Sequence, residues 1–548
     1  MVVPVNSIGG TEADFSDNPD FNDHLGLVCF RALAHKPWRT VLIERTQGRK
    51  ALKAGILLAV AYTIARYWRD TVKEERIGLL LPPGAGGLIA NLAALWAGKV
   101  PVNLNYTLGA DAFGACLDTA EIRTLVTAKA LRQKFPSLHY PKDVRYLEED
   151  CKQYLPGVPG LLLLALRASL FPRGLMNVME LEEKGGDREA ALLFSSGSEG
   201  SPKGVVLTHR NLLGNIAQIK ACGALTRRQK MLGCLPIFHS FGFTVTLWYA
   251  LLEELTVISL PSPLEHKRIG KVIQEEQVNI FISTPTFLRP HLNNTPPDRL
   301  ASLKITIAGA EKTPQGLAEA WEQKFGSEYL EGYGLSETSP VVSVNLPRYV
   351  AKLSRVDQPI KRMGSVGPLI PGLAARIVSP ETGKDLPFTE TGLLYLRGVN
   401  IFPGYLKNAE ATSQALDQGW FNTGDLACFD KDGFLFIKGR LKRFSKIGGE
   451  MVPHGAVEQQ IAALMGVELR EAPVLAICGK KHSSKGEQLV LLCTMELNFP
   501  ELLEKLRATD LPKLWLPKSW LKVEAIPTLA SGKLDLQSLQ ALAEGKMI

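Results

Sequence analysis

The sequence predicts an α/β fold with a large N-terminal domain and a small C-terminal one. Short apolar runs alternate with amphipathic helical patterns along most of the chain, which is typical of sheets covered by helices. From about Met363 the pattern changes to short strands separated by Gly and Pro turns, which indicates a small β-rich subdomain. The segment 441–548 has helix and strand patterns of its own and is long enough for a small α+β domain.

The individual elements follow in order along the chain. ERIGLLLPP predicts a strand, LIANLAALWAGK the next helix and VPVNLN the next strand, and GVVLTHRNLLGNIAQ predicts a strand followed by a helix. The same alternation recurs in KMLGCLPIF, LTVISLP, VNIFISTP and LKITIAGAE. In the β-rich part, GLLYLRG and GFLFIKGR predict strands. We place the domain boundary inside GRLKRFSKIGGEM, so the predicted domains are residues 1–440 and 441–548.

Composition is that of an ordinary globular protein and excludes several functional classes. The 548 residues are 45% hydrophobic and 22% charged, which is enough for two or more domain cores. The formal net charge of +8 is modest, and without a clustered basic patch it does not indicate a nucleic-acid partner. The eight cysteines are scattered with no CxxC pair, which argues against a zinc site or a disulfide framework and indicates a reducing compartment.

The N-terminus and two apolar segments bear on targeting to, or contact with, a membrane. The N-terminal MVVPVNSIGGTEADF lacks the basic start and apolar core of a signal peptide. GILLAVAYTIA, residues 55–65, is too short to span a bilayer and predicts a buried helix. LLLLAL, residues 161–166, is followed by Arg167 and Arg173. Two interpretations of it are open: a core segment, or a basic, apolar surface helix that contacts lipid or a partner.

The segment 194–209, FSSGSEGSPKGVVLTH, concentrates glycine, serine and a lysine after a short apolar run. Such a density of glycine amides and hydroxyls suits a loop that wraps polyphosphate, and Lys203 adds positive charge. It is not a Walker loop, because no G-x4-G-K-[ST] spacing fits. A Ser/Gly-rich linker is the alternative, although the loop leads directly into a strand and a helix. The predicted phosphate-binding residues are Ser195, Ser196, Gly197, Ser198, Glu199, Gly200 and, as a catalytic residue, Lys203.

This loop resembles the phosphate loop of the acyl-adenylate-forming (AMP-binding) superfamily, which includes acyl-CoA synthetases, luciferases and peptide-synthetase adenylation domains. Five further segments follow in the order of that superfamily and cover nearly the whole chain. The resemblance implies two α/β sheet subdomains and a small β-barrel-like subdomain in the large domain, with a small mobile α+β domain after it. It also implies ATP and Mg²⁺ as cofactors, and a first half-reaction that joins a carboxylate to AMP and releases pyrophosphate.

Two of these segments, AGAEKTP at 308–314 and EGYGLSETSP at 331–340, line the adenine pocket and the metal site in the family. A flat purine needs glycine where the backbone approaches its face and an aromatic ring to stack on, and Mg²⁺ needs a carboxylate. An ordinary strand-to-turn connection is the alternative for GYGLSET alone. By resemblance, the nucleotide site contains Gly309, Ala310, Glu311, Tyr333, Gly334 and Ser336, with Glu337 as a catalytic residue and metal ligand.

The remaining family motifs lie nearer the C-terminus. By resemblance, Asp425 of WFNTGD accepts hydrogen bonds from the ribose hydroxyls, and Arg440 supports the same sugar. Lys533 in SGK matches the terminal catalytic lysine of the family. A cation there stabilises the negative charge that builds as the carboxylate attacks the α-phosphorus. Lys442 occupies the hinge about which the small domain would rotate for thioester formation, and Lys446 matches a lysine that some relatives use in that second state.

LPIFHSFGFTVTLW, residues 235–248, places His239 between aromatic residues. The residue type by itself favours a satisfied core histidine, whereas the resemblance favours a catalytic gate over the acyl site. The apolar residues beside it suit a hydrocarbon pocket and equally suit plain core. They are Phe241, Phe243, Val245 and Trp248.

Finer details bear on the acyl acceptor. KRF.KI.GEMV after the hinge and GSEG in the loop resemble the acyl-[acyl-carrier-protein] synthetase half of the bifunctional bacterial 2-acylglycerophosphoethanolamine acyltransferase. The other half should carry H-x4-D, and none of the nine histidines has Asp five positions later, so we expect a stand-alone synthetase. Basic residues near the hinge suit an acidic carrier protein, with solvated surface charge as the alternative. They are Lys438, Lys442, Arg443 and Lys446.

Together these observations predict ATP-dependent activation of a medium- or long-chain fatty acid and its transfer to acyl carrier protein, for phospholipid synthesis or repair. The alternative is a fatty acyl-CoA synthetase, which shares every adenylation residue and differs only in how the thiol is delivered. An inactive lipid-binding scaffold would be favoured by loss of Lys533, Glu337 or Asp425, and all three are present. We expect a cytoplasmic protein, and peripheral contact with the inner face of the membrane stays open as an alternative.

Overall fold

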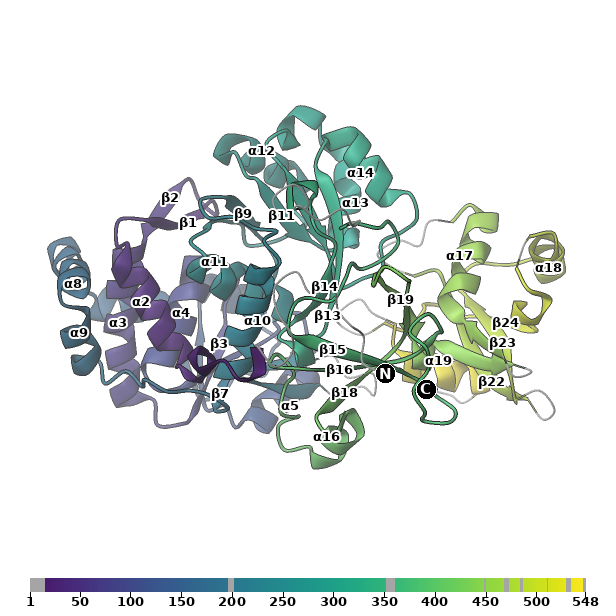
Figure 1. Ribbon diagram of the computed structural model, residues 1–548, viewed down its shortest axis with the longest axis horizontal. Coiled ribbons are helices and arrows are strands. Elements are labelled where there is room, and N and C mark those ends of the chain that lie inside the picture. The colour runs from purple at the N-terminus through teal and green to yellow at the C-terminus, as the bar shows by residue number, and fades with distance from the viewer. Residues whose placement is uncertain are drawn as a thin grey trace.

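Four sheets make up the computed structural model of the chain (Figure 1). Three of them form a large body, and the fourth belongs to a small C-terminal part at one end. This arrangement confirms the predicted α/β class with a large N-terminal and a small C-terminal domain. The structure describes residues 15–195, 202–350, 360–447, 450–467, 473–482, 486–509, 511–528 and 534–545.

The largest sheet has eight strands in the order β14-β13-β12-β11-β9-β10-β1-β2. The strands from β13 to β1 in this order are parallel, and the edge strands β14 and β2 are antiparallel. β11 is buried along its whole length, as expected of a parallel strand covered on both faces. The four predicted strands between 230 and 310 are confirmed. The bounds are β1 Thr40–Glu44, β2 Lys50–Lys53, β9 Lys230–Gly233, β10 Thr256–Ser259, β11 Ile280–Ser283, β12 Ile305–Ala308, β13 Glu328–Gly334 and β14 Val341–Val344.

The second sheet has six strands in the order β6-β5-β3-β4-β7-β8. All neighbours are parallel except β7 and β8, which form an antiparallel hairpin around the predicted phosphate loop. The strands predicted from ERIGLLLPP, VPVNLN and GVVLTH are confirmed as β3, β4 and β8. The bounds are β3 Arg76–Leu80, β4 Val100–Asn103, β5 Thr124–Thr127, β6 Asp143–Tyr146, β7 Glu189–Ser195 and β8 Lys203–Thr208.

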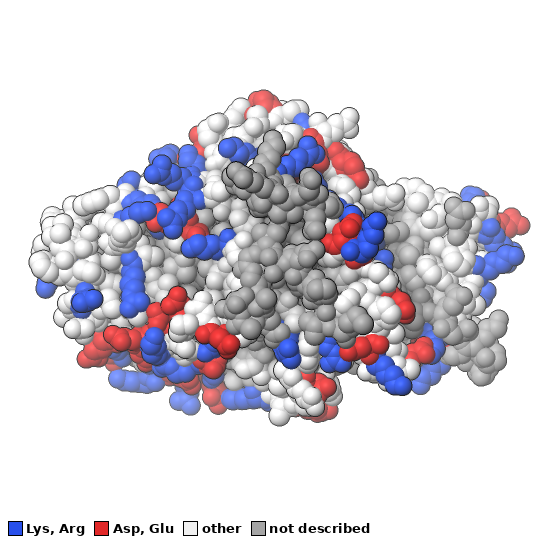
Figure 2. Space-filling model, in the orientation of Figure 1, with Lys and Arg blue, Asp and Glu red and all other residues white. Residues whose placement is uncertain are grey.

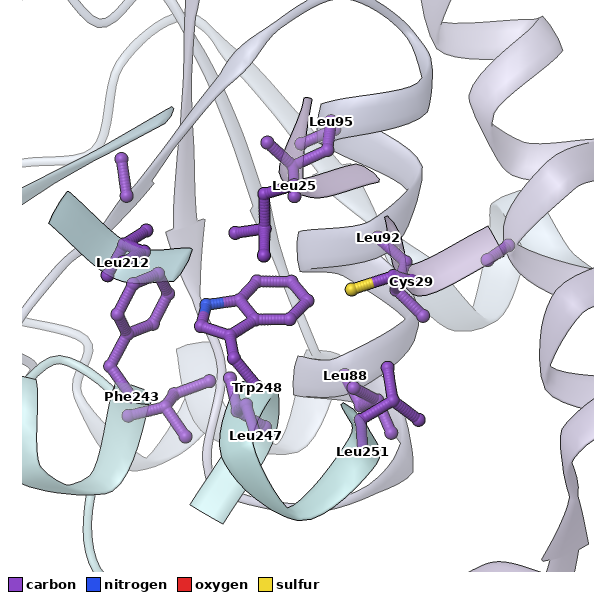
Figure 3. Packing of buried hydrophobic residues seen from close by; sticks show 14 of the residues in the cluster. Leu25, Cys29, Leu88, Leu92, Leu95, Leu212, Phe243, Leu247, Trp248 and Leu251 are labelled. Atoms are coloured by element: carbon purple, nitrogen blue, oxygen red, sulfur yellow. The ribbon is translucent and has the colours of Figure 1, made fainter. Parts of the chain in front are cut away.

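Helices cover both large sheets. Those between the two sheets bury their apolar faces in one shared core, whereas α12 to α14 pack in a second apolar cluster and α5 in a third. The predicted buried helix is confirmed as α3, and Trp248 and Phe243 pack among leucines from several elements (Figure 3). The helices of the body are α2 Leu25–His35, α3 Ala54–Thr71, α4 Ala85–Trp96, α5 Ala110–Ala120, α6 Lys129–Lys134, α7 Leu147–Tyr154, α8 Val158–Leu170, α9 Pro172–Val178, α10 His209–Ala221, the π-helix η2 Phe241–Tyr249, α11 Ala250–Leu252, α12 His266–Glu276, α13 Pro285–Asn294 and α14 Leu317–Phe325.

The predicted β-rich region forms a third sheet of five strands, whose neighbours are all antiparallel. In Figure 1 it lies between the two large sheets and the small C-terminal part. Its strands are β15 Leu373–Val378, β16 Gly392–Gly398, β17 Leu416–Asp417, β18 Trp420–Phe429 and β19 Leu435–Arg440, with α16 Ala409–Ala415 beside them.

The small C-terminal part has a five-stranded sheet and three helices. The predicted domain boundary falls at the short 3-10 turn η5 Leu441–Arg443, between the last strand of the third sheet and the first strand of the fourth. The elements are β20 Phe444–Ile447, β21 Glu450–Pro453, α17 His454–Met465, β22 Leu475–His482, β23 Gly486–Cys493, α18 Phe499–Arg507, β24 Ser519–Lys522 and α19 Leu536–Glu544.

The apolar segment 161–166 lies in α8 and is not a plain core segment. Ala165 is buried, but Leu162, Leu163 and Leu166 are exposed, so the core interpretation is wrong for these three leucines. The following helix α9 is bent by 113° from α8. Within the described part of the chain, no single helix has the length and hydropathy to cross a membrane, and only this bent pair meets those criteria when its two helices are taken together.

Candidate functional site

Glu337 lies in the 3-10 turn η4 Ser336–Thr338, directly after β13, and only 9% of it is exposed. The hydroxyl of Tyr405 donates a hydrogen bond to Glu337 Oε1 at 2.9 Å. Burial, and then the neighbouring Glu337 carboxylate, raise the pKa of Tyr405 far above its ordinary value. The phenol therefore stays a protonated donor, and it fixes the orientation of the carboxylate.

The segment that carries Tyr405 is held by the N-terminus of α10. Thr208 and Asn211 form a capping box there, which explains why the helix begins directly after β8. The Asn211 amide donates to the carbonyls of Val399 and Ile401, at 2.8 Å each. The next residue along, Phe402, donates its backbone N–H to the backbone carbonyl of Glu337 at 2.9 Å. The cap thus positions Tyr405 over Glu337.

Lys203 begins β8 on the other side of Tyr405. Its Nζ lies 5.5 Å from the centroid of the Tyr405 ring, within cation–π range. Ser195 ends β7 and pairs with Lys203 across the hairpin, where its hydroxyl donates to the Lys203 carbonyl at 3.5 Å. Both ends of the predicted phosphate loop are therefore together beside Glu337 and Tyr405. The loop residues Ser196, Gly197, Ser198, Glu199 and Gly200 lie outside the described residues.

A second buried carboxylate, Asp425, lies on β18 opposite Arg440 of β19. Only 3% of Asp425 is exposed, and its Oδ1 lies 2.9 Å from Arg440 Nε. The Tyr333 hydroxyl donates to Asp425 Oδ2. Burial, and then the Asp425 carboxylate, raise the pKa of Tyr333 well above its ordinary value, so this phenol is also a protonated donor. The structure thus brings three predicted site residues into one cluster.

The glycines predicted to contact a purine have different structural roles. A Cβ on Gly334 would lie 2.1 Å from the Pro340 carbonyl oxygen, so the turn after β13 itself requires glycine. A Cβ on Gly309 would make ordinary contacts at 3.4 Å with Phe241 and the Gly332 carbonyl. Gly334 is therefore explained by the strand-to-turn connection, and it need not mark a ligand contact.

Ala310 and Glu311 follow Gly309 after β12, and both are exposed. Ala310 has a φ of +69°, in the left-handed region that non-glycine residues seldom adopt. Glu311 accepts a hydrogen bond from the Thr286 hydroxyl at 2.6 Å, from the start of α13. These two residues therefore lie at the edge of the site, outside its buried centre.

His239 is exposed, so the core-histidine interpretation is wrong. Its ring lies 4.6 Å from that of Phe238, and the π-helix η2 begins two residues later. Such helices are frequent at functional sites. The preceding turn also brings Ser240 to 3.3 Å from Ser336, hydroxyl to hydroxyl. The gate role of His239 stays a prediction.

The hydrocarbon-pocket residues divide into two groups. Phe243, Val245 and Trp248 are buried in the shared core, with Phe243 and Trp248 packed against Leu25, Leu88 and Leu212 as Figure 3 shows. Phe241 is half-buried and lies against Gly309. The packing favours plain core for the first group and leaves Phe241 as the one that reaches the site.

Two of the basic residues near the hinge form ion pairs. Lys446 Nζ lies 2.6 Å from Glu381 Oε1, an ion pair that joins β20 to the loop after β15. Arg443 pairs with Glu458 within the small C-terminal part. Lys438 is exposed. The Lys442 side chain and Lys533 lie outside the described residues. Two of the four basic residues predicted to receive a carrier protein are thus already paired with acidic neighbours.

A magnesium ion would need ligands from a bound nucleotide. Within the described ranges, no group of three or more His, Cys, Asp or Glu side chains could hold a metal by itself. Mg²⁺ commonly binds through one or two carboxylates together with substrate phosphates, so a single oriented carboxylate such as Glu337 fits this mode.

Sequence reasoning missed three residues that build the site: Tyr405, Ser240 and Thr423. Thr423 Oγ1 accepts a hydrogen bond from the Asp425 amide at 3.1 Å. Tyr405 follows Pro403 and Gly404, a context that reads as an ordinary turn. Ser240 could have been found from its position next to His239, and Thr423 from its position inside WFNTGD.

Comparison with known proteins identifies the family. A family model described as AMP-binding enzyme matches residues 56–406, more than half of the chain. A rice 4-coumarate–CoA ligase-like protein is 31% identical, with 95% of this chain and 93% of that protein covered. A long-chain fatty acid–CoA ligase of Bacillus subtilis is 26% identical, with 84% of each covered. The chain therefore belongs to the AMP-binding enzyme family, the adenylate-forming acid–thiol ligases.

Solved structures share the fold. An o-succinylbenzoate CoA synthetase from Bacillus subtilis, in complex with its acyl-adenylate intermediate, has a TM-score of 0.77 at 21% identity and covers 93% of this chain and 97% of that one. A fatty acyl CoA synthetase from Mycobacterium tuberculosis has a TM-score of 0.68 at 22% identity, with 96% and 99% covered. The architecture described above is therefore the family fold.

Proposed function

We propose that the protein activates a medium- or long-chain fatty acid with MgATP and transfers the acyl group to the phosphopantetheine thiol of an acyl carrier protein. The observation that carries the adenylation step is a pair of buried, hydrogen-bonded carboxylates, Glu337 and Asp425, which both raise the pKa of Arg440 and therefore lie near it. Lys203, at one end of the Gly/Ser-rich loop, lies beside the Tyr405 ring that donates to Glu337. Family membership supports the same reaction class.

In the proposed first half-reaction, a carboxylate oxygen of the fatty acid forms a bond to the α-phosphorus, and the bond to pyrophosphate breaks. Asp425 accepts hydrogen bonds from the ribose hydroxyls, with Arg440 beside it. Glu337, oriented by Tyr405, would hold Mg²⁺ together with the phosphates of ATP. Mg²⁺ bound there would neutralise phosphate charge as pyrophosphate leaves. Lys203 adds a positive charge at the end of the loop.

The proposed second half-reaction uses the same bound adenylate and a different face of the small domain. In the first half-reaction Lys533 lies between the carboxylate and the α-phosphate. Rotation of the small domain about Lys442 moves Lys533 away from the adenylate and lets the thiol reach the acyl carbon. The sulfur–carbon bond forms, the bond between the acyl carbon and the phosphate oxygen of AMP breaks, and the thiol proton passes to solvent as AMP leaves. The site residues on the body keep their contacts with AMP throughout, because they belong to the sheets and do not move with the small domain.

The proposed acceptor is carrier protein on the strength of KRF.KI.GEMV and GSEG. Coenzyme A is the second candidate, and the names of the relatives favour it, because both relatives described above are called CoA ligases. The pairing of Lys446 with Glu381 and of Arg443 with Glu458 weakens the electrostatic argument for a carrier.

The acceptor is tested by supplying purified protein, MgATP and labelled fatty acid with either holo-acyl carrier protein or coenzyme A. Labelled thioester on the carrier with coenzyme A inert supports the proposal. Efficient transfer to coenzyme A and none to the carrier overturns the carrier assignment and leaves a fatty acyl-CoA synthetase. Apo-carrier protein, which has the same surface and no thiol, is the matched control.

A further inference from the structure

We propose that α8 and α9 form a docking surface for an anionic lipid bilayer, so that the protein binds peripherally at a membrane. Of the twelve exposed large hydrophobic residues in the described part of the chain, seven lie in this one helix pair. Phe171 is 69% exposed, and Leu163 and Leu170 are 60% and 61% exposed. We call these seven the apolar cap: Val158, Leu162, Leu163, Leu166, Leu170, Phe171 and Val178. A contiguous apolar patch on a globular surface marks an interaction site.

The apolar cap is fixed in place by the opposite face of the same helices. Ala165 and Ala168 are buried against the body, and a Cβ on Gly55 of α3 would lie 2.9 Å from the Cβ of Ala165. Leu175 and Met179 are buried likewise. Because one face is packed into the core, turning the leucines inward or moving the pair across a bilayer would break these buried contacts. It presents an apolar surface that can lie in the plane of an interface.

The charged residues beside the apolar cap indicate that the bilayer surface is anionic. Between residues 155 and 179 the only charged side chains are Arg167 and Arg173, and both are exposed. Figure 2 shows the end of the molecule that carries α8 and α9 as mainly uncharged, with a few basic side chains on it and both acidic and basic ones along its lower border. Arginines beside inserted apolar side chains suit the phosphates of anionic lipid headgroups.

Aromatic residues border the same surface. Trp38 is 65% exposed and follows Pro37, whose Cβ lies 3.0 Å from the Cβ position of Gly55, beside Ala165. Tyr154 precedes α8 and is also exposed. Amphipathic Trp and Tyr rings are enriched at the level of lipid headgroups. The apolar cap therefore has both the apolar centre and the aromatic border of a membrane-facing surface.

A second copy of the chain is the competing occupant, and charge disfavours it. A symmetric dimer through the apolar cap would bring Arg167 and Arg173 of both copies to one interface, with no acidic side chain in residues 155–179 to pair with them. The next acidic residue, Glu180, already pairs with Arg69. A bilayer supplies the missing negative charge. The apolar cap also lies at the end of the molecule opposite the small C-terminal part, so a membrane there would leave that part unobstructed (Figure 1).

The test is flotation of the purified full-length protein with vesicles of phosphatidylcholine containing phosphatidylglycerol, and with vesicles of phosphatidylcholine alone. Binding is measured without ATP or fatty acid, so its failure would not bear on the adenylation proposal. We expect binding to the anionic vesicles that weakens with salt. Replacing Leu163, Leu170 and Phe171 together with Ser should lower the affinity by more than about tenfold.

Two further variants make the result decisive. The pair Arg167→Gln and Arg173→Gln should lower binding to anionic vesicles several-fold and remove most of its salt dependence, even if the triple variant fails to fold. Leu264→Ser with Met363→Ser removes two exposed apolar side chains elsewhere and should change nothing. Absence of binding by the unaltered protein, equal binding by the triple variant, or a dimer that the triple variant dissociates would each overturn the proposal.

Discussion

The candidate site residues on the body and those on the small C-terminal part are held in different ways. Glu337 and Asp425 are buried and bonded to tyrosines of the same rigid body. Lys446 is exposed, and its ion pair with Glu381 bridges the small part and the body through two half-exposed side chains. The residues on the body can change partners only by breaking buried contacts. The exposed ion pair contributes little to stability, so Lys446 can exchange its partner at small cost.

The largest effect is expected at the small part. Lys533→Ala should slow acyl-AMP formation by about 10²–10³-fold, the range for removing one preorganised transition-state donor. Formation of thioester from preformed acyl-AMP should barely change, because the proposal gives Lys533 a role in the first half-reaction only. The two half-reactions are measured separately by pyrophosphate release and by thioester yield. Equal losses in both would contradict the rotation of the small domain.

Asp425→Asn should give the next largest loss of rate, and the loss should affect both half-reactions and not only the first. Hydrogen bonds to charged groups contribute about 1.5–3 kcal/mol, so we expect a loss of about 10- to 100-fold. It should appear in both half-reactions, since ATP and acyl-AMP carry the same ribose. Asp417→Asn on the neighbouring strand β17 is the matched control and should leave both rates unchanged. A loss confined to one half-reaction would show that Asp425 does not hold the shared nucleotide.

Tyr405→Phe removes the hydroxyl that orients Glu337 and keeps the ring beside Lys203. We expect adenylation to fall by about tenfold, because one hydrogen bond to a charged group is lost, and the Mg²⁺ concentration for half-maximal rate to rise. Tyr395→Phe, whose hydroxyl accepts from Asn422, is the control. An unchanged Mg²⁺ dependence would argue that Glu337 does not hold the metal.

The smallest effect is expected at the ion pair between the two regions. Glu381→Gln removes an exposed pair worth about 0.2–1 kcal/mol, so acyl-AMP formation should change by less than about fivefold. Lys446→Ala removes the same pair together with the lysine. If Lys446 acts in the second state, Lys446→Ala slows thioester formation from preformed acyl-AMP and Glu381→Gln does not. Equal behaviour of the two variants would limit Lys446 to the ion pair.

Much of the fold could be predicted from the sequence, because the central strands are short, mostly apolar runs between turn residues and helical patterns. β11 and β12 fall inside the predicted VNIFISTP and LKITIAGAE for this reason. The helix α8 could not be assigned in the same way. Its leucines have the composition of a core segment, and only the tertiary packing of Ala165 and Ala168 decides which face is buried.

The site was predictable where a motif carries its chemistry within a few residues, and less so where partners are distant in sequence. Asp425 and Arg440 lie opposite each other on the two strands of one hairpin, and their side chains pair directly. Tyr405 lies 68 residues from Glu337 and reaches it through the cap of α10, which no local pattern indicates. Gly334 fits a nucleotide motif, yet the Pro340 carbonyl explains it without a ligand.

The most direct test of the central claim is isotope exchange between pyrophosphate and ATP, measured with no thiol acceptor present. The account predicts exchange that requires both Mg²⁺ and a fatty acid, because acyl-AMP forms reversibly on the body before any acceptor binds. Asp425→Asn should depress this exchange, and Asp417→Asn should not. Exchange that does not depend on fatty acid, or none at all from folded protein across medium- and long-chain acids, would contradict an adenylate-forming fatty acid ligase.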